Sequence, residues 1–348
     1  MNFKNYMLMT TKNFLFLIYF FIAASASSQN QNNSVQNFTK SMPGILVDAG
    51  GHKLHLNIQG NGSPTIIFEN GSQDFSFIWS LVQPKVAKFA KTVSYDRAGY
   101  AWSEPGPMPR TSKQICYELH TALNNAGIHP PYILVGQSYG GFLVRAFARY
   151  YPNEVVGMVL VEAVQEDQRI FMGADTPQLI RNFAQGRVVP DVQTNFAPQP
   201  DTAQQNMMNA EIDPLFKKFP DSIQQMQVWA QSQPQFIKAV QGEMDWSPED
   251  VADMYAHKND ANYMLGNMPL IVLTRGKGGF DEKADSSQLE KERLQAQEQL
   301  AHLSSNSKHI IDMNSGHNIH VEDSAIVIKA IKEVFTAAAK HILLQQVK

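Results

Sequence analysis

One serine in the chain, Ser138, has the surroundings of a catalytic nucleophile. It stands in the stretch ILVGQSYGGFLV, between Gly136 and Gly140, directly after a run of apolar, strand-forming residues. A nucleophilic hydroxyl must be exposed, lie next to a base and face donors for the oxyanion that its attack creates. The pattern G-x-S-x-G at a strand-to-helix junction meets these needs, because the serine occupies a sharp turn in which the glycines avoid collisions. The alternative is that Ser138 only caps the helix that follows.

A candidate base comes from the far end of the chain. His317 lies in the stretch MNSGHNIH, after the last predicted strand, and Gly316 before it allows a tight turn. A neutral imidazole can take the serine proton near physiological pH and return it to the leaving group. We therefore predict that His317 is the catalytic base and that His320, three residues later, has a structural role.

Three further stretches extend this pattern: FENGSQDFSFIW, SYDRAGYAWSEP and NSGHNIHVED. With GQSYGG, they make the chain resemble the α/β-hydrolase family from Gly44 to the C-terminus. The resemblance implies a mainly parallel eight-stranded sheet flanked by helices, a serine–histidine–acid triad, and a helical cap that governs access of the substrate. The dehalogenase and epoxide-hydrolase branches of this fold need Asp at position 138, so the serine argues against them.

The resemblance also implies an oxyanion hole made of two backbone N–H groups. One belongs to Tyr139, after the nucleophile, and the other to Ser72, in the loop after the third strand. Many relatives carry His-Gly in that loop, whereas this chain has Asn-Gly, and a simple turn is the alternative there. Asp96 and Arg97 are expected to fix the loop after the fourth strand, as the similar D-R-x-G segment does in relatives.

The third member of the triad has more than one candidate. In most relatives an Asp follows the seventh strand, but the expected position here is Gly279 and the nearest acid is Asp281. The other location known in the family is the end of the sixth strand, where VVGMVLVEAVQED offers Glu162. A buried carboxylate needs a partner, and the histidine would provide one. We therefore favour Glu162 over Asp281, with Asp167 third.

The elements that would position these residues alternate along the chain. Apolar stretches predict strands at 44–49, 53–60, 65–70, 91–99, 132–138, 155–163, 269–276 and 308–314, the first two as a hairpin around Gly50-Gly51. Helical patterns lie at 77–90, 111–127, 142–152, 286–304 and 324–344. Apolar strands separated by helices indicate an α/β protein whose parallel sheet is covered on both faces.

The alternation breaks at about 164–267, a stretch rich in Gln, Met, Asn and Pro with apolar residues at helical spacing. We interpret it as the cap. Eight large apolar residues either form a roof over the site or pack cap helix on cap helix: Met172, Met207, Met208, Met226, Trp229, Phe236, Met244 and Trp246.

The whole chain has 348 residues, of which 43% are apolar and 18% charged, with a net charge of −3. This composition is typical of a globular protein and gives no indication of a nucleic-acid surface. Residues 1–26 read as a signal peptide, so we expect a secreted or periplasmic protein. Residues 27–43 form a polar segment, and 44–348 form the hydrolase domain. The single cysteine, Cys116, excludes an intramolecular disulfide.

These features predict a serine hydrolase that cleaves small to medium carboxylic esters through an acyl-enzyme. The sequence contains no H-E-x-x-H motif or Cys/His cluster, so we expect neither a metal nor a cofactor. An aminopeptidase of the proline-releasing type, or an amidase, is the first alternative. It would need a cap carboxylate to hold the substrate amine, for which the candidates are Glu211, Asp213, Glu243 and Asp245. A non-catalytic binding or sensor protein is the second alternative, and the oligomeric state stays open.

Overall fold

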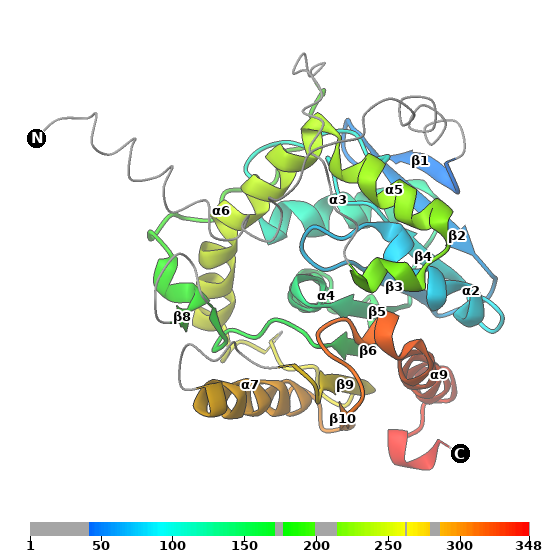
Figure 1. Ribbon diagram of the computed structural model, residues 1–348, viewed down its shortest axis with the longest axis vertical. Helices are drawn as coiled ribbons and strands as arrows, with labels where there is room; N and C mark the ends of the chain where they lie inside the picture. The colour runs from blue at the N-terminus through cyan, green and yellow to red at the C-terminus, as the bar shows by residue number, and fades with distance from the viewer. Residues whose placement is uncertain (1–41, 171–176, 199–213, 262, 279–285, 348) are drawn as a thin grey trace, which may run out of the picture.

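An eight-stranded sheet forms the centre of the computed structural model, in the order β1-β2-β4-β3-β5-β6-β9-β10 (Figure 1). The strands are β1 Ile45–Asp48, β2 Lys53–Gln59, β3 Thr65–Glu69, β4 Thr92–Tyr95, β5 Tyr132–Gln137, β6 Val155–Val161, β9 Leu270–Arg275 and β10 Ser307–Asp312. β2 pairs antiparallel with β1 and with β4, whereas all other neighbours in the sheet are parallel. The predicted α/β class and the mainly parallel eight-stranded sheet are confirmed.

The structure describes residues 42–170, 177–198, 214–261, 263–278 and 286–347. The predicted signal peptide and nearly all of the polar segment lie outside these residues, as does Asp281. Within the described residues, no helix combines the length and hydropathy needed to cross a membrane.

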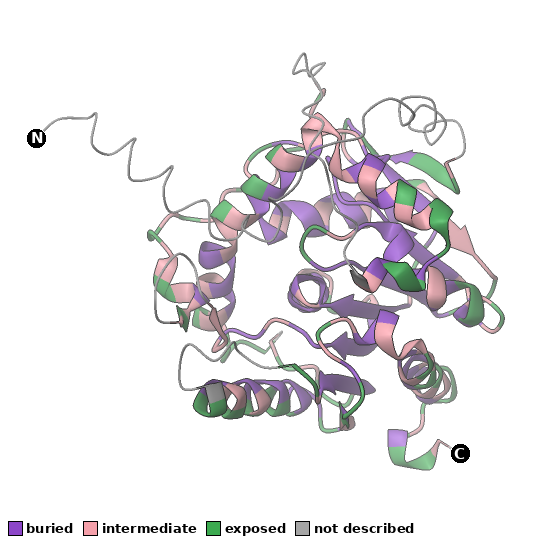
Figure 2. Ribbon diagram, in the orientation of Figure 1, coloured by how far each residue is buried: buried purple, intermediate pink, exposed green. Residues whose placement is uncertain are grey.

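Helices cover both faces of the sheet, which explains why the central strands are apolar throughout. Every residue of β3, β4, β5 and β9 is buried (Figure 2). One face carries α3 Ser112–Asn125 and α4 Tyr139–Tyr150, and the other carries η2 Ser76–Leu81, α2 Gln83–Val86 and α9 Ser324–Lys340 (Figure 1). α7 Ser286–Ala301 packs beside β9 and β10.

The closing helix α9 shows how the sequence pattern produces this packing. Its buried residues recur at helical spacing on one side: Val327, Ala330, Ile331, Val334, Ala337 and Ala338. The side chain of Asp323 accepts hydrogen bonds from the backbone N–H groups of Ala325 and Ile326, so it caps the first turn. After α9, the chain ends in η5 Leu344–Gln346.

The helix predicted at 77–90 is wrong in detail. The chain forms the 3-10 helix η2 and then the separate four-residue helix α2, with Pro84 in its first turn. Proline has no backbone N–H, so it cannot continue a helix that began before it, but it fits the first turn of a new one.

In the described residues between β6 and β9, the chain forms five short elements and one long helix. They are β7 Arg169–Ile170, β8 Gln178–Leu179, η3 Ile180–Phe183, η4 Pro214–Lys218, α5 Asp221–Gln231 and the long helix α6 Pro234–Ala256. The short helix α8 Ile319–Glu322 follows β10. α6 packs against α3, α5 and η3. This segment meets the core through an aromatic cluster that includes Trp229 and Phe236 from α5 and α6, and Phe75, Tyr100 and Trp102 from the core loops.

Candidate active site

Ser138 lies at the junction of β5 and α4 in a conformation that strains the backbone. Its φ is 53° and its ψ is −120°, a combination that residues other than glycine rarely adopt. A Cβ on Gly136 would lie 2.4 Å from the Gly140 oxygen, and one on Gly141 would lie 2.3 Å from the Ala163 side chain. The glycines are therefore required for the close packing of the turn, as the sequence indicated.

Backbone hydrogen bonds hold this turn on the sheet. The N–H of Ser138 donates to the Val161 oxygen at 3.1 Å, and its carbonyl accepts from the N–H groups of Gly141 at 3.0 Å and Val164 at 2.9 Å. The Ser138 residue is only partly buried. The surrounding structure thus stabilises a strained residue while leaving its hydroxyl within reach of solvent.

The segment that carries His317 lies next to this turn. Gln137, directly before the serine, donates from Nε2 to the carbonyl oxygen of His317 at 3.4 Å, and to the side chain of Asn318 at the same distance. Among the described residues, the Ser138 hydroxyl and the His317 ring form no hydrogen bond. In substrate-free sites such bonds are often long and shorten when substrate binds.

The imidazole of His317 is held neutral by its surroundings. The residue is exposed by surface area, but desolvation of its ring by the surrounding protein lowers its pKa to about 4. The positive charges of Arg275 and Arg293 lower the pKa further, and Glu322 opposes them. A neutral ring is the form that can accept a proton from serine.

Glu162, the favoured acid, follows β6 and has a φ of 43°. Its Oε1 accepts a hydrogen bond of 2.6 Å from Arg293 and lies 3.2 Å from Nε of Arg275, and its Oε2 accepts from the backbone N–H of Arg275 at 2.7 Å. Burial raises the pKa of this carboxyl, and the two arginines oppose that rise. Both oxygens are therefore bound by arginines, and no hydrogen bond joins Glu162 to His317 in the described part of the chain.

The other acids and the second histidine take different positions. Asp167 forms an ion pair with Arg181 and is partly exposed. His320 is fully buried, and its ring packs 4.7 Å from that of Trp79, centre to centre. Burial and the neighbouring His317 lower the pKa of His320 to about 3. These contacts fit a structural role for His320.

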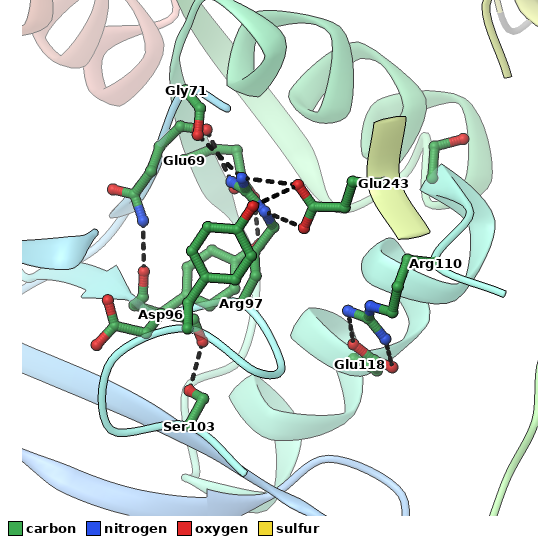
Figure 3. Close-up of polar contacts among 12 residues, drawn as sticks. Glu69, Gly71, Asp96, Arg97, Ser103, Arg110, Glu118 and Glu243 are labelled. Atoms are coloured by element: carbon green, nitrogen blue, oxygen red, sulfur yellow. Dashed lines mark hydrogen bonds and ion pairs between the residues drawn. The ribbon is translucent and has the colours of Figure 1, made fainter. Parts of the chain in front are cut away.

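Hydrogen bonds from Arg97 and Asn70 hold the loop after β3, which would supply the second oxyanion donor. Arg97 donates to the carbonyl oxygens of Asn70 at 2.8 Å and Gly71 at 2.9 Å (Figure 3). The side chain of Asn70 donates to the Tyr95 carbonyl at 2.7 Å. Gly71 is buried and Ser72 is exposed, so the loop presents its Ser72 end outward.

Glycine packing brings this loop against the serine turn. A Cβ on Gly140 would lie 2.5 Å from the Glu69 oxygen and 2.6 Å from the Asn70 oxygen, and one on Gly71 would lie 2.2 Å from Oε1 of Gln137. The backbone of Tyr139 and the loop that leads to Ser72 thus belong to two segments in close contact. The arrangement can place two N–H groups on one side of a reacting carbonyl.

Asp96 and Arg97, the expected loop-fixing residues, are buried and fully engaged. Asp96 accepts from the backbone N–H of Ser76 at 2.7 Å and pairs with His55 at 2.7 Å. Its carbonyl accepts from the hydroxyl of Ser103 (Figure 3). The sequence did not indicate that Arg97 also anchors the loop after β3, because that contact joins residues more than 25 positions apart.

The described cap residues are largely packed. Trp229 and Phe236 are 4% and 6% exposed in the aromatic cluster, with Met226 and Met244 packed against it. Arg187 lies over the ring of Trp246 at 4.2 Å. Trp229 and Phe236 contact the core-loop rings of Trp102 and Phe75, so the contacts of these cap residues extend beyond packing of cap helix on cap helix. The remaining predicted roof residues, at positions 172, 207 and 208, lie outside the described residues.

Comparisons with known proteins agree with this geometry. A model of the alpha/beta hydrolase fold family matches residues 64–324. The chain is 25% identical over 283 residues to the uncharacterized protein YqjL of Bacillus subtilis, which covers 81% of this chain and 88% of YqjL.

Two solved structures of similar fold are enzymes with different substrates. A meta-cleavage product hydrolase from Pseudomonas fluorescens has a TM-score of 0.58 and 16% identity, and the match covers 86% of this chain and 99% of that one. A thermophilic esterase from Thermogutta terrifontis has a TM-score of 0.56 and 17% identity, with 84% and 98% covered. These similarities establish the fold alone, whereas the family model spans three quarters of the chain. The chain belongs to the α/β hydrolase fold family, and its relatives support a hydrolase.

Proposed function

We propose that this protein is a serine hydrolase that cleaves carboxylic esters through an acyl-enzyme. The observation that carries the proposal is the strained, partly exposed Ser138, which stands in the G-x-S-x-G turn beside the segment of His317. A backbone outlier held by its surroundings at a solvent-accessible hydroxyl is typical of a functional residue.

The steps follow from the groups in place. His317 takes the proton of the Ser138 hydroxyl as the oxygen attacks the ester carbonyl, and the backbone N–H groups of Ser72 and Tyr139 stabilise the oxyanion. The protonated imidazole then gives its proton to the leaving alkoxide, which leaves an acyl-enzyme. Water, deprotonated by His317, attacks that ester, and the carboxylic acid departs from Ser138.

Two carboxylates, Glu162 and Asp281, are the main candidates for the acid that orients His317. Glu162 already serves as the counterion of Arg275 and Arg293, and no hydrogen bond joins it to His317 among the described residues. This favours the alternative candidate Asp281, which follows β9 in the sequence and lies outside the described residues.

The cap contacts favour an ester over the amine-bearing substrate of an aminopeptidase. Of the four cap carboxylates considered for an amine, Glu243 is 2% exposed and paired with Arg97, and Asp245 is paired with Arg187. Glu211 and Asp213 lie outside the described residues. In the described part of the cap, the carboxylates considered are therefore occupied by arginines.

The proposal is tested with the purified protein lacking residues 1–26. We expect wild type to hydrolyse p-nitrophenyl acetate and butyrate faster than proline anilide, and a fluorophosphonate probe to label it but not the Ser138→Ala variant. Faster turnover of proline anilide would favour the aminopeptidase. Absence of labelling and of turnover would favour a non-catalytic binding or sensor protein.

We also propose that residues 1–26 direct secretion, because an apolar stretch from Phe14 to Ala24 ends in the small-x-small sequence Ala24-Ser25-Ala26. N-terminal sequencing of protein from a secreting bacterial host should find a chain that begins at Ser27. A retained Met1 in exported or cell-associated protein would contradict this.

A further inference from the structure

Arg97 connects three parts of the molecule that are distant in sequence. Its guanidinium carries five N–H donors. Nε and Nη2 donate to the two oxygens of Glu243 at 2.8 and 3.1 Å, Nη1 donates to Glu69 at 2.9 Å, and the remaining two donors bind the loop carbonyls of Asn70 and Gly71 (Figure 3). Every donor of Arg97 therefore has a partner, and the guanidinium has one orientation that satisfies all of them.

The contact with Glu243 crosses from the core to the cap. Glu243 lies in α6, 146 positions after Arg97, and the hydroxyl of Tyr100 donates to its Oε2 at 2.8 Å. Arg97 and Glu243 are 1% and 2% exposed. Glu243 and Glu69 are both counterions of this buried guanidinium, and Glu243 alone binds two of its donors, so the placement of α6 contributes to the orientation of Arg97.

The contact with Gly71 reaches the proposed oxyanion hole. The carbonyl of Gly71 and the N–H of Ser72 belong to one planar trans peptide, in which the two groups point in opposite directions. A hydrogen bond of 2.9 Å from Arg97 to that carbonyl therefore fixes the direction of the Ser72 N–H. A positive donor on the carbonyl also polarises the peptide and strengthens the N–H as a donor.

We propose that Glu243 and Arg97 are positioning residues that make the geometry of the oxyanion hole depend on the seating of the cap helix α6. This inference rests on the proposed function, since it assigns the Ser72 N–H to the oxyanion. It adds a role for α6: through one carboxylate and one guanidinium, this helix aligns a donor that stabilises the transition state.

A matched control exists on the same helix. Glu249 is a buried carboxylate of α6 at 3% exposure that binds a guanidinium, Arg187, at 2.9 Å. Its partner belongs to the stretch between β8 and α5 and has no contact with the loop after β3 among the described residues. Glu249→Gln therefore removes an ion pair of α6 with a more exposed arginine, 28% against 0% for Arg97, without touching the proposed connection.

The test compares Glu243→Gln, Tyr100→Phe and Glu249→Gln with wild type on p-nitrophenyl butyrate, with thermal unfolding measured for each. An amide at position 243 presents an NH2 group to a donor of Arg97, so the two-fold contact is lost. We expect kcat of Glu243→Gln to fall roughly tenfold to a hundredfold with KM within about threefold, since a misdirected oxyanion donor acts on the transition state. Tyr100→Phe keeps the ion pair, and we expect a smaller fall in kcat.

A trifluoromethyl ketone gives a readout that a purely structural role would not change. It forms a tetrahedral adduct with the serine, so Glu243→Gln should weaken its inhibition in proportion to the loss of kcat/KM, whereas Glu249→Gln should leave both within about twofold of wild type. Equal effects of the two substitutions, or a Glu243→Gln variant with wild-type kcat, would overturn the inference alone. A wild type that neither hydrolyses esters nor reacts with a fluorophosphonate would overturn the proposed function and the inference together.

Discussion

The two sides of the candidate site use buried charge in different ways. On the oxyanion side, one cation, Arg97, is shared by two carboxylates, Glu69 and Glu243. On the histidine side, two cations, Arg275 and Arg293, share Glu162 and Glu290. The first cluster has one positive charge too few and the second is balanced.

The difference appears in the groups next to each cluster. Burial raises the pKa of Glu69 to about 7, with Arg97 opposing and Glu243 adding to the rise. On the histidine side, burial and the two arginines lower the pKa of His317 to about 4. One cluster thus fixes a backbone loop with a single shared cation, while the other sets the charge state of a side chain.

The largest effect is expected for Arg97→Met. The substitution leaves two buried carboxylates without a cation, and breaking a buried pair in this way costs roughly 3–5 kcal/mol. The free energy of unfolding from urea titration measures it. Arg293→Met leaves Arg275 with Glu162 and should cost clearly less. Equal losses would show that the two clusters do not differ in how far they depend on one cation.

The next prediction concerns the acid of the triad. Loss of an orienting carboxylate lowers kcat by up to about 10⁴-fold in a serine hydrolase of this kind. We expect Asp281→Asn to approach such a loss and Glu162→Gln to lower kcat less than about tenfold, because Glu162 binds arginines. Steady-state kinetics on p-nitrophenyl butyrate separate the two. A kcat much lower in Glu162→Gln than in Asp281→Asn would show that Glu162 is the orienting acid.

A smaller effect is expected in the pH dependence of activity. His317 must be neutral to act as the base. We therefore expect kcat/KM to stay constant as the pH falls below 6.5 and to decline only near pH 4. Arg293→Gln removes a positive charge near the ring, which eases protonation and should move this decline upward. A wild-type decline at or above pH 6.5, unchanged in the variant, would show that the arginines do not act on His317.

The smallest effect is on the pH dependence of stability. Glu69 has a higher pKa in the folded state, about 7, than its ordinary value of 4.5. The folded state then binds the proton more tightly, so this contribution to stability is full below pH 4.5 and is lost as the pH rises to 7. Urea titrations of wild type and Glu69→Gln across this range should show a shallower decline in the variant. Parallel curves would contradict the raised pKa.

The sheet and the serine turn could be predicted because their signals are local. Apolar runs mark the buried strands, and G-x-S-x-G is a contiguous pattern in which a Cβ on Gly136 would collide with the backbone of Gly140, four residues later. The helix predicted at 77–90 from its apolar spacing is divided in the structure, because Pro84 cannot continue a helix that begins before it.

The charge clusters could not be predicted, because their partners are far apart in the chain. Glu162 meets the backbone of Arg275 and the side chain of Arg293 across 113 and 131 positions, and Arg97 meets Glu243 across 146. Composition and spacing identify each of these residues as charged, but the partner depends on how cap, loops and sheet pack. The sequence indicates that Glu162 follows a buried strand and needs a partner, but not that the partners are Arg275 and Arg293.

The proposed acyl-enzyme mechanism depends most on Ser138 as the nucleophile. The most direct test is to mix the protein with p-nitrophenyl acetate, quench with acid within the first turnover and map the acetyl group by mass spectrometry of its peptides. We predict one acetyl group on Ser138, formed with a burst of p-nitrophenol and absent from Ser138→Ala. Steady hydrolysis without an acetylated Ser138, or equal turnover by Ser138→Ala, would contradict the account.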